Sequence, residues 1–193
     1  FLRNLDDLTR HPDVVEELFY LMGRMVSHCP DPLVTSPLLQ SLFQCAVVGM
    51  QLDHRDANKG TLNFLENAIS YGLSLRERNK PECQQALERV LISEGQAVAT
   101  NLARALMGDL PAYSVDHGHG SIAGILWKLN LLSPTLVLQW MTVSLAAAPE
   151  RARTDFLGAL DSGLPREDFN LAVRAFIASC GRHRKLNKIR GQQ

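Results

Sequence analysis

The stretch LDHRDANKGTLNFLENAIS, residues 52–70, contains both a helix start and the apolar face of the helix that follows it. Asp53 is a good N-cap residue, and Asp56 then falls at the third helical position, as in a carboxylate version of the capping box. Both carboxylates also lie at the positive end of the helix dipole, which favours negative charge. We therefore predict a helix from about residue 53 to 71, with Asp53 and Asp56 as its structural caps.

Asp53, His54 and Asp56 also have a chemical interpretation. A histidine between two carboxylates could bind a metal ion, and an all-α hydrolase that uses these three residues is the enzymatic alternative. A metal site needs three or four ligands that converge, usually from separate elements. His117 and His119 could chelate an ion from an extended segment, but on a helix they would point about 200° apart. We interpret them as exposed polar residues. We predict no metal, no cofactor and no enzymatic activity.

The remainder of the chain continues the helical pattern, with proline at most of the helix starts. Apolar residues recur at three- and four-residue spacing, and no segment alternates as a strand would. We expect antiparallel helix pairs with short joints. The predicted pairs are 12–28 with 36–51, 53–71 with 82–107, 115–131 with 134–147, and 150–161 with 165–180, followed by a basic tail at 181–193.

Helix pairs at this spacing are typical of HEAT repeats. Pair starts near residues 12, 53, 115 and 150 have a mean step close to the roughly 40–47 residues of such repeats. Each pair has more apolar surface than it can cover alone, and stacking on its neighbours would bury that surface. We predict an all-α fold, an α-solenoid in which residues 1–193 form a single segment; a compact all-α bundle is the alternative.

Charge is unevenly distributed along the 193 residues, of which 46% are hydrophobic and 21% charged. Residues 1–180 carry all 20 acidic residues and 15 of the 20 Lys and Arg, a net charge of −5. Residues 181–193 carry the other five basic residues, a net charge of +5. Such a tail could contact nucleic acid or an acidic partner, or could be a solvated helix end.

The four cysteines, Cys29, Cys45, Cys83 and Cys180, form no C-x-x-C pair. We expect all four to be reduced, as in a protein of the cytosol or nucleus. No apolar run reaches the roughly 18 residues that a membrane-spanning helix requires. The chain begins at Phe1 without a methionine or a signal peptide, and we expect it to be part of a longer protein.

Three stretches carry a resemblance to a known family. They are HPDVVEELFYLMGRMVSHCP (11–30), LLQSLFQCAVVGMQLDHRDANKGTLNFLENAI (38–69) and LPAYSVDHGHGSIAGILWKLNLLSPTLVLQWMTVSL (110–145). Together they resemble the C-terminal HEAT repeats of the transportin-SR and importin-13 subfamily of the importin-β (karyopherin) family. The motif LDHRDAN, the Leu110-Pro111 turn and the proline-started helix with Trp140 are the most specific points of likeness. The resemblance extends to about residue 147, and the last two helices match in pattern only.

The resemblance implies a right-handed superhelical stack that belongs to a nuclear import receptor. Such receptors carry protein cargo through the nuclear pore, contact nucleoporins, release cargo when RanGTP binds, and shuttle between cytoplasm and nucleus. Members of this subfamily import splicing factors with arginine/serine-rich domains. The second helix of each pair lines the concave face in this family. The residues that we predict to contact a partner there are Arg89, Gln96, Thr100 and Arg104.

One departure from the family pattern limits what the resemblance implies. The family reads phosphorylated arginine/serine domains with an arginine-rich helix, because the planar guanidinium binds phosphate bidentately. Residues 1–180 contain no such helix. We therefore expect this segment to form the closing end of the arch, with a secondary surface for cargo or Ran and no direct contact with nucleic acid. A HEAT scaffold subunit of a multiprotein complex, unrelated to transport, is the alternative function.

Overall fold

The computed structural model describes residues 5–190, with side chains described as far as residue 183. The helices are α1 (Leu5–Arg10), α2 (Pro12–His28), α3 (Pro30–Val34), α4 (Leu38–Gly49), α5 (Arg55–Ser74), α6 (Pro81–Met107), α7 (Ile122–Leu132), α8 (Pro134–Ser144), α9 (Glu150–Asp161) and α10 (Arg166–Arg190). No strand occurs within residues 5–190, and the predicted all-α class is confirmed.

Proline and glycine define several helix ends. Helices α2, α3, α6 and α8 each begin with proline, whose missing N–H is not needed in the first turn. Helix α6 ends at Gly108, which has the left-handed φ of 78° that glycine adopts without strain. The N–H of Asp109 then donates to the carbonyl of Arg104 at 2.8 Å, which closes the helix end. These local signals explain why most boundaries could be predicted within a few residues.

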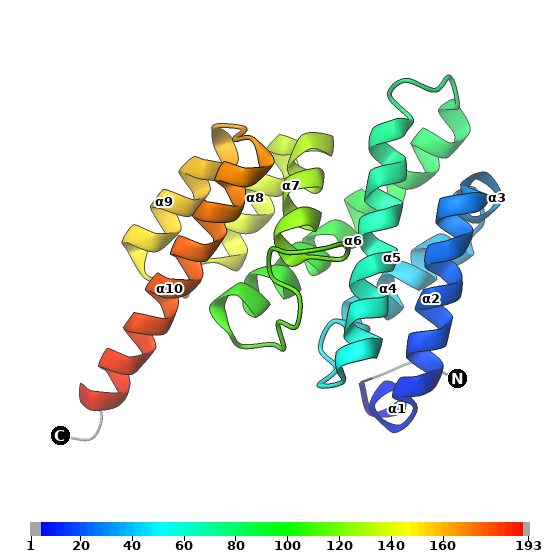
Figure 1. The fold of residues 1–193 in the computed structure, drawn as a ribbon. Helices are drawn as coiled ribbons and strands as arrows, with labels where there is room; N and C mark the ends of the chain where they lie inside the picture. The colour runs from blue at the N-terminus through cyan, green and yellow to red at the C-terminus, as the bar shows by residue number, and fades with distance from the viewer. Residues whose placement is uncertain (1–4, 191–193) are drawn as a thin grey trace.

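The helices stack in two layers, as Figure 1 shows. The first layer contains α2, α5, α7 and α10, each packed against the next. The second layer contains α4, α6 and α8, which also pack in order, with α9 against α8. The chain runs across both layers from one end of the molecule to the other, and the two ends lie far apart (Figure 1). This stacking of pairs is consistent with the predicted α-solenoid.

The last helix pair reverses the order of the first three. In those pairs the first helix lies in the first layer, whereas in the last pair it is the second helix, α10, that packs against α7. Helix α10 also continues to Arg190, so that residues 181–190 of the predicted basic tail are helical. Residues 191–193 of that tail lie outside the described residues.

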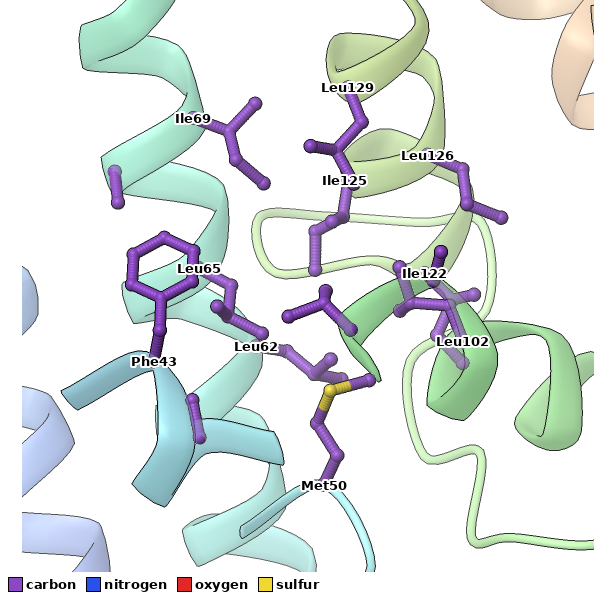
Figure 2. Packing of buried hydrophobic residues seen from close by; sticks show 14 of the residues in the cluster. Phe43, Met50, Leu62, Leu65, Ile69, Leu102, Ile122, Ile125, Leu126 and Leu129 are labelled. Carbon is purple, nitrogen blue, oxygen red and sulfur yellow. The ribbon is translucent and has the colours of Figure 1, made fainter. Parts of the chain in front are cut away.

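One apolar core runs through the layers. Phe64 of α5 joins three helices, because its ring centroid lies 5.4 Å from that of Phe19 in α2 and 5.9 Å from that of Phe43 in α4. Farther along α5, Ile69 points toward Leu129 of α7 (Figure 2). All five side chains are buried, and each contributes about 1.5–3 kcal/mol by leaving water. The core therefore continues from one helix pair into the next.

The prediction that a helix begins at residue 115 is wrong. Residues 108–121 form a long loop, and α7 begins only at Ile122. Gly118 and Gly120 have φ angles of 80° and 71°, which an α-helix cannot contain. Ser121 then caps α7, since its Oγ accepts the N–H of Gly124 at 3.1 Å.

Candidate protein-interaction surface

The second-layer helices α4, α6 and α8 run parallel to one another. Gln40 and Gln44 near the start of α4 donate to Glu94 of α6 at 3.0 and 2.8 Å. Toward the end of α4, the carbonyl of Val47 accepts from Asn101 of α6 at 2.5 Å. At these contacts the residue numbers increase along both helices in the same direction, so α4 and α6 are parallel. We call the exposed side chains of α4, α6 and α8 the second-helix face.

Helix α8 lies beside α6 in the same direction. The Trp140 ring covers Gly95, where an added Cβ would lie only 2.3 Å from the ring. One turn farther along, the hydroxyls of Thr100 and Ser144 are 2.9 Å apart. A glycine at residue 95 is therefore required by the close approach of the two helices.

The four predicted partner-contact residues all lie on α6, but they differ in exposure. Arg89 and Gln96 are exposed, while Thr100 and Arg104 are half-buried. The Thr100 hydroxyl is engaged, since it donates to the Gln96 carbonyl at 2.8 Å and lies close to Ser144. Arg89 Nε donates to the Gln85 carbonyl at 3.3 Å. The role of these four residues in partner binding stays a prediction, and of the four only Arg89 and Gln96 have exposed side chains.

The second-helix face has a charge pattern that sequence reasoning missed. Residues 32–52, which include α4, contain no Asp, Glu, Lys, Arg or His, and the same is true of residues 129–149, which include α8. In the whole chain 21% of residues are charged. The absence of charge over two such stretches is visible in the sequence. It would have identified these helices as unusual before their common layer was known.

A pocket opens beside the second-helix face. It has a volume of about 390 Å³ and lies where α6 meets the end of α5 and the junction of α7 with α8. Leu87, Leu91 and Ile92 of α6 line one side, and Leu132 and Leu136 line the other. Arg76, Gln84, Glu88 and Ser133 also line it, so that its wall is partly polar and includes one charge of each sign.

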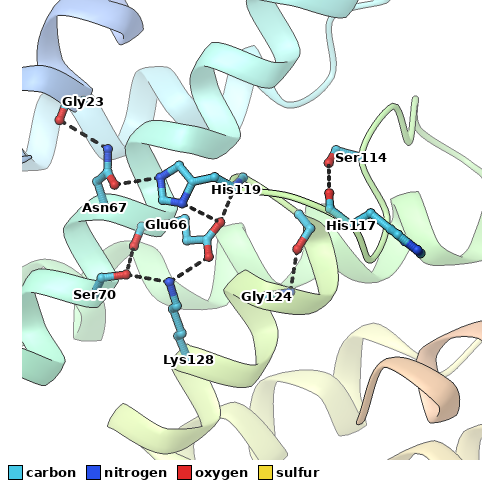
Figure 3. Close-up of polar contacts among 11 residues, drawn as sticks. Gly23, Glu66, Asn67, Ser70, Ser114, His117, His119, Gly124 and Lys128 are labelled. Atoms are coloured by element: carbon cyan, nitrogen blue, oxygen red, sulfur yellow. Dashed lines mark hydrogen bonds and ion pairs between the residues drawn. The ribbon is translucent and has the colours of Figure 1, made fainter. Parts of the chain in front are cut away.

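A buried carboxylate in the first layer holds the loop at 108–121 in place (Figure 3). Glu66 of α5 is only 1% exposed, and its Oε1 accepts from Lys128 Nζ of α7 at 2.7 Å. Its Oε2 accepts the backbone N–H of Gly120. The Lys128 ammonium also donates to Ser70 at 2.8 Å. Glu66 falls four residues after Leu62 on the apolar stripe of α5, and this misplaced charge is the signal that could have identified it.

His119 adds a second contact between the same loop and α5. One ring nitrogen lies 3.5 Å from Glu66 Oε2, and the other lies 2.7 Å from Asn67 Oδ1. Asn67 in turn donates to the carbonyl of Gly23 in α2 at 3.2 Å. This cluster therefore connects α2, α5, α7 and the loop.

The other end of the loop's polar network reaches α10. Arg174 Nε donates to Asp116 Oδ2, and His117 Nδ1 lies 2.5 Å from Asp116 Oδ1. Burial raises the pKa of Asp116, but the hydrogen bonds from Arg174 and His117 outweigh it and hold that pKa below its usual 3.8. The carboxylate is therefore ionised at neutral pH, and the loop bridges α5 and α10.

The prediction that Asp53 caps α5 is wrong by one residue. The N-cap is His54, whose extended backbone lets its Nδ1 accept the N–H of Ala57 at 3.3 Å. Asp53 instead accepts the hydroxyl of Tyr113 from the loop at 2.5 Å. Asp56 lies in the first turn rather than at the third helical position, so the capping box does not form. It retains the favourable place near the positive end of the helix dipole.

The histidines considered for metal binding contact different partners. The His117 ring faces Arg174, with 3.2 Å between Nε2 and the guanidinium Nη2, whereas His119 faces α5. Within the described part of the chain, no three His, Cys, Asp or Glu side chains are grouped so that they could hold a metal ion. None of the helices described is both long and apolar enough to span a bilayer.

Comparison with curated proteins gives several relatives, two of which follow. The chain is similar to Transportin MOS14 of Arabidopsis thaliana, with 26% identity over 180 residues, which is 89% of this chain and 18% of that protein. It is also similar to the uncharacterized protein C11G11.07 of Schizosaccharomyces pombe (strain 972 / ATCC 24843), with 32% identity over 62 residues, 32% of this chain and 6% of that protein. No family model matches. The chain thus spans less than a fifth of the length of these relatives, and its likeness to Transportin MOS14 extends over most of its helix pairs.

Proposed function

We propose that this chain is a segment of a nuclear transport receptor of the importin-β (karyopherin) type. The observation that carries the proposal is the similarity to Transportin MOS14 over 89% of the chain. The two-layer stack of helix pairs supports it, because a solenoid of this kind offers a long surface to a protein partner. On this proposal the chain binds protein partners and catalyses no reaction.

The finer proposal follows the transportin-SR and importin-13 resemblance. The receptor carries protein cargo, including arginine/serine-rich splicing factors, into the nucleus, contacts nucleoporins on the way, and releases cargo when RanGTP binds. It therefore shuttles between cytoplasm and nucleus. This segment contributes a secondary surface for cargo or Ran, with Arg89 and Gln96 of α6 among its contact residues.

The test uses the full-length protein with purified Ran. We expect the protein to retain Ran loaded with a non-hydrolysable GTP analogue and not Ran loaded with GDP. We also expect GTP-loaded Ran to displace a bound arginine/serine-rich domain. Equal retention of both Ran forms, or of neither, contradicts the receptor function and leaves the scaffold function standing.

An import assay in permeabilised cells tests the direction of transport. The full-length protein, with Ran and an energy source, is expected to concentrate a fluorescent arginine/serine-rich cargo in the nucleus. The same cargo without the receptor should stay outside. Accumulation that does not depend on the receptor contradicts the import function.

A further inference from the structure

His117 and His119 lie two residues apart in the loop at 108–121, but they contact different helices. Figure 3 shows that the His119 ring points toward α5 and that the His117 side chain points the other way. Their side chains are 77% and 52% exposed, so that protons reach both rings from the solvent. Histidine ordinarily changes its charge between about pH 5 and 8. The partners of each ring therefore decide how its contact responds to acid.

The partners of His117 fit the neutral ring. Its Nδ1 lies 2.5 Å from Oδ1 of the ionised Asp116, which can only accept, so Nδ1 carries the proton. Its Nε2 lies 3.2 Å from Nη2 of Arg174, and a guanidinium can only donate, so Nε2 carries none. A second proton would place N–H against N–H and add a positive charge beside the guanidinium. Protonation of His117 therefore removes one contact between the loop and α10.

The partners of His119 fit the protonated ring (Figure 3). The amide nitrogen of Asn67 donates to the Gly23 carbonyl, so the atom that faces His119 Nε2 at 2.7 Å is the amide oxygen, which accepts its N–H. The other ring nitrogen, Nδ1, lies 3.5 Å from Glu66 Oε2. The neutral ring presents a lone pair to this carboxylate oxygen, whereas the protonated ring presents an N–H. Protonation of His119 therefore strengthens the contact between the loop and α5.

Two further cations lie near the α5 end of the loop. Lys128 of α7 donates to Glu66 Oε1 at 2.7 Å, whereas the oxygen that faces His119 is Oε2. Arg166 of α10 reaches the same region, since its Nη2 and Glu66 Oε1 each lie 3.2 Å from the Cβ position of Gly124. Both cations oppose a charge on His119. The added proton nevertheless faces a carboxylate oxygen to which Lys128 does not donate, so the contact gains an ion pair.

We propose that the loop at 108–121 is a pH-operated strap, in which protonation of His119 tightens the loop on α5 and protonation of His117 loosens it from α10. Near neutral pH the strap joins both helices, and in acid it stays on α5 and opens at α10. Gly118 separates the two histidines, and the open space around it leaves room for the two halves of the loop to move separately. The inference goes beyond the proposed function and is independent of it, because it concerns contacts within this segment.

Hydrogen exchange of the full-length protein at about pH 8 and about pH 5.5 tests the proposal. Mass spectrometry with fragmentation to single amides gives protection factors, which are corrected for the intrinsic effect of pH on exchange. The Gly120 N–H, which donates to Glu66, reports on the α5 end. The Ala123 N–H, which donates to the Val115 carbonyl at 2.8 Å, reports on the half of the loop next to Asp116. On acidification we expect the protection of Gly120 to rise and that of Ala123 to fall, each by about two- to fivefold.

Glutamine variants separate the two rings, because glutamine donates and accepts hydrogen bonds but does not ionise. In His117→Gln the protection of Ala123 should no longer depend on pH, while that of Gly120 should still rise in acid. His119→Gln should show the reverse. His28→Gln, at an exposed position at the end of α2, is the matched control and should behave as the wild type does.

Arg174→Met removes the α10 partner of the loop and gives the protection of Ala123 in the opened strap. It should bring the value at about pH 8 down to the level of the wild type at about pH 5.5 or below it. Protection that does not change with pH, or that changes in the same direction at both amides, overturns the proposal. Retained pH dependence of Ala123 in His117→Gln, or of Gly120 in His119→Gln, overturns it as well.

Discussion

At the scale of single residues, Glu66 shows how a buried charge can be accommodated. One oxygen of its carboxylate accepts a hydrogen bond from the Lys128 ammonium, and the other accepts one from the Gly120 N–H. Both oxygens are therefore hydrogen-bonded although they are buried. Burial of an ion pair gives little net stability, but removal of one partner leaves an uncompensated charge. Helical periodicity could place Glu66 on the buried face of α5 but could not predict its partners, because they lie more than fifty residues away along the chain.

Glu66→Gln is expected to lower the free energy of unfolding by about 3 kcal/mol, because the ammonium of Lys128 then lies half-buried without a counter-charge. Urea denaturation measures the loss. The Lys128→Met variant provides a double-mutant cycle, in which the two substitutions together should cost less than the sum of the separate costs. Strictly additive costs would show that the pair has no coupling.

Asp31 of α3 gives a prediction about pH. Hydrogen bonds from Lys80 and Tyr71 hold the pKa of Asp31 below its usual 3.8. A carboxyl group with a lowered folded-state pKa stabilises the protein above its unfolded pKa, and this contribution is lost as the pH falls below about 3.8.

Asp31→Asn should therefore lower the thermal midpoint near neutral pH and make it less dependent on pH as the pH falls below about 3.8. Asp161→Asn, at the exposed end of α9, is the control and should follow the wild-type curve. Parallel curves for wild type and Asp31→Asn would contradict the assigned role of this carboxylate.

At the scale of elements, the helix boundaries depend on local chemistry and could largely be predicted. Proline at the start of α2, α6 and α8 and the end of α6 at Gly108 are properties of the residues themselves. The loop at 108–121 could not be placed, because its conformation depends on contacts with α5 and α10. The shift of the α5 cap by one residue has the same cause, since Tyr113 of the loop engages Asp53.

His54→Ala is expected to destabilise the protein by about 1 kcal/mol, because the Ala57 N–H at the start of α5 loses its acceptor. His54→Asp keeps an acceptor at the N-cap and adds a favourable charge near the helix dipole, so it should retain or raise stability. Urea denaturation of both variants tests this. An equal loss in both would show that the cap does not matter here.

At the scale of the whole molecule, the repeated spacing of helix pairs predicted the stack. The resemblance of stretches within residues 11–145 to importin-β HEAT repeats predicted which kind of solenoid it is. The reversed order of the last pair could not be predicted, because it depends on which surfaces of α9 and α10 fit α8 and α7. The absence of charge on α4 and α8 could be noticed from the sequence alone. The two uncharged helices could be recognised as parts of one surface only from the structure, which places α4 and α8 in the same layer.

Gly95→Ala tests the fit between successive pairs. An added methyl group would meet the Trp140 ring, and we expect a destabilisation of about 1–3 kcal/mol, despite the better helix propensity of alanine. Gly158 of α9 is the matched control, because no atom lies within 4 Å of an added Cβ there. Gly158→Ala should stabilise the protein by up to about 1 kcal/mol. Thermal denaturation distinguishes the two, and equal effects would contradict the close packing of α6 on α8.

The bridge that the loop at 108–121 makes between α5 and α10 affects the elasticity of the molecule. A solenoid bends by lengthening one side and shortening the other. Glu66 on α5 accepts the N–H of Gly120, and Arg174 on α10 donates to Asp116, so lengthening of the first-layer side would stretch both contacts. We therefore expect the molecule to resist closing around the second-helix face more than it resists opening.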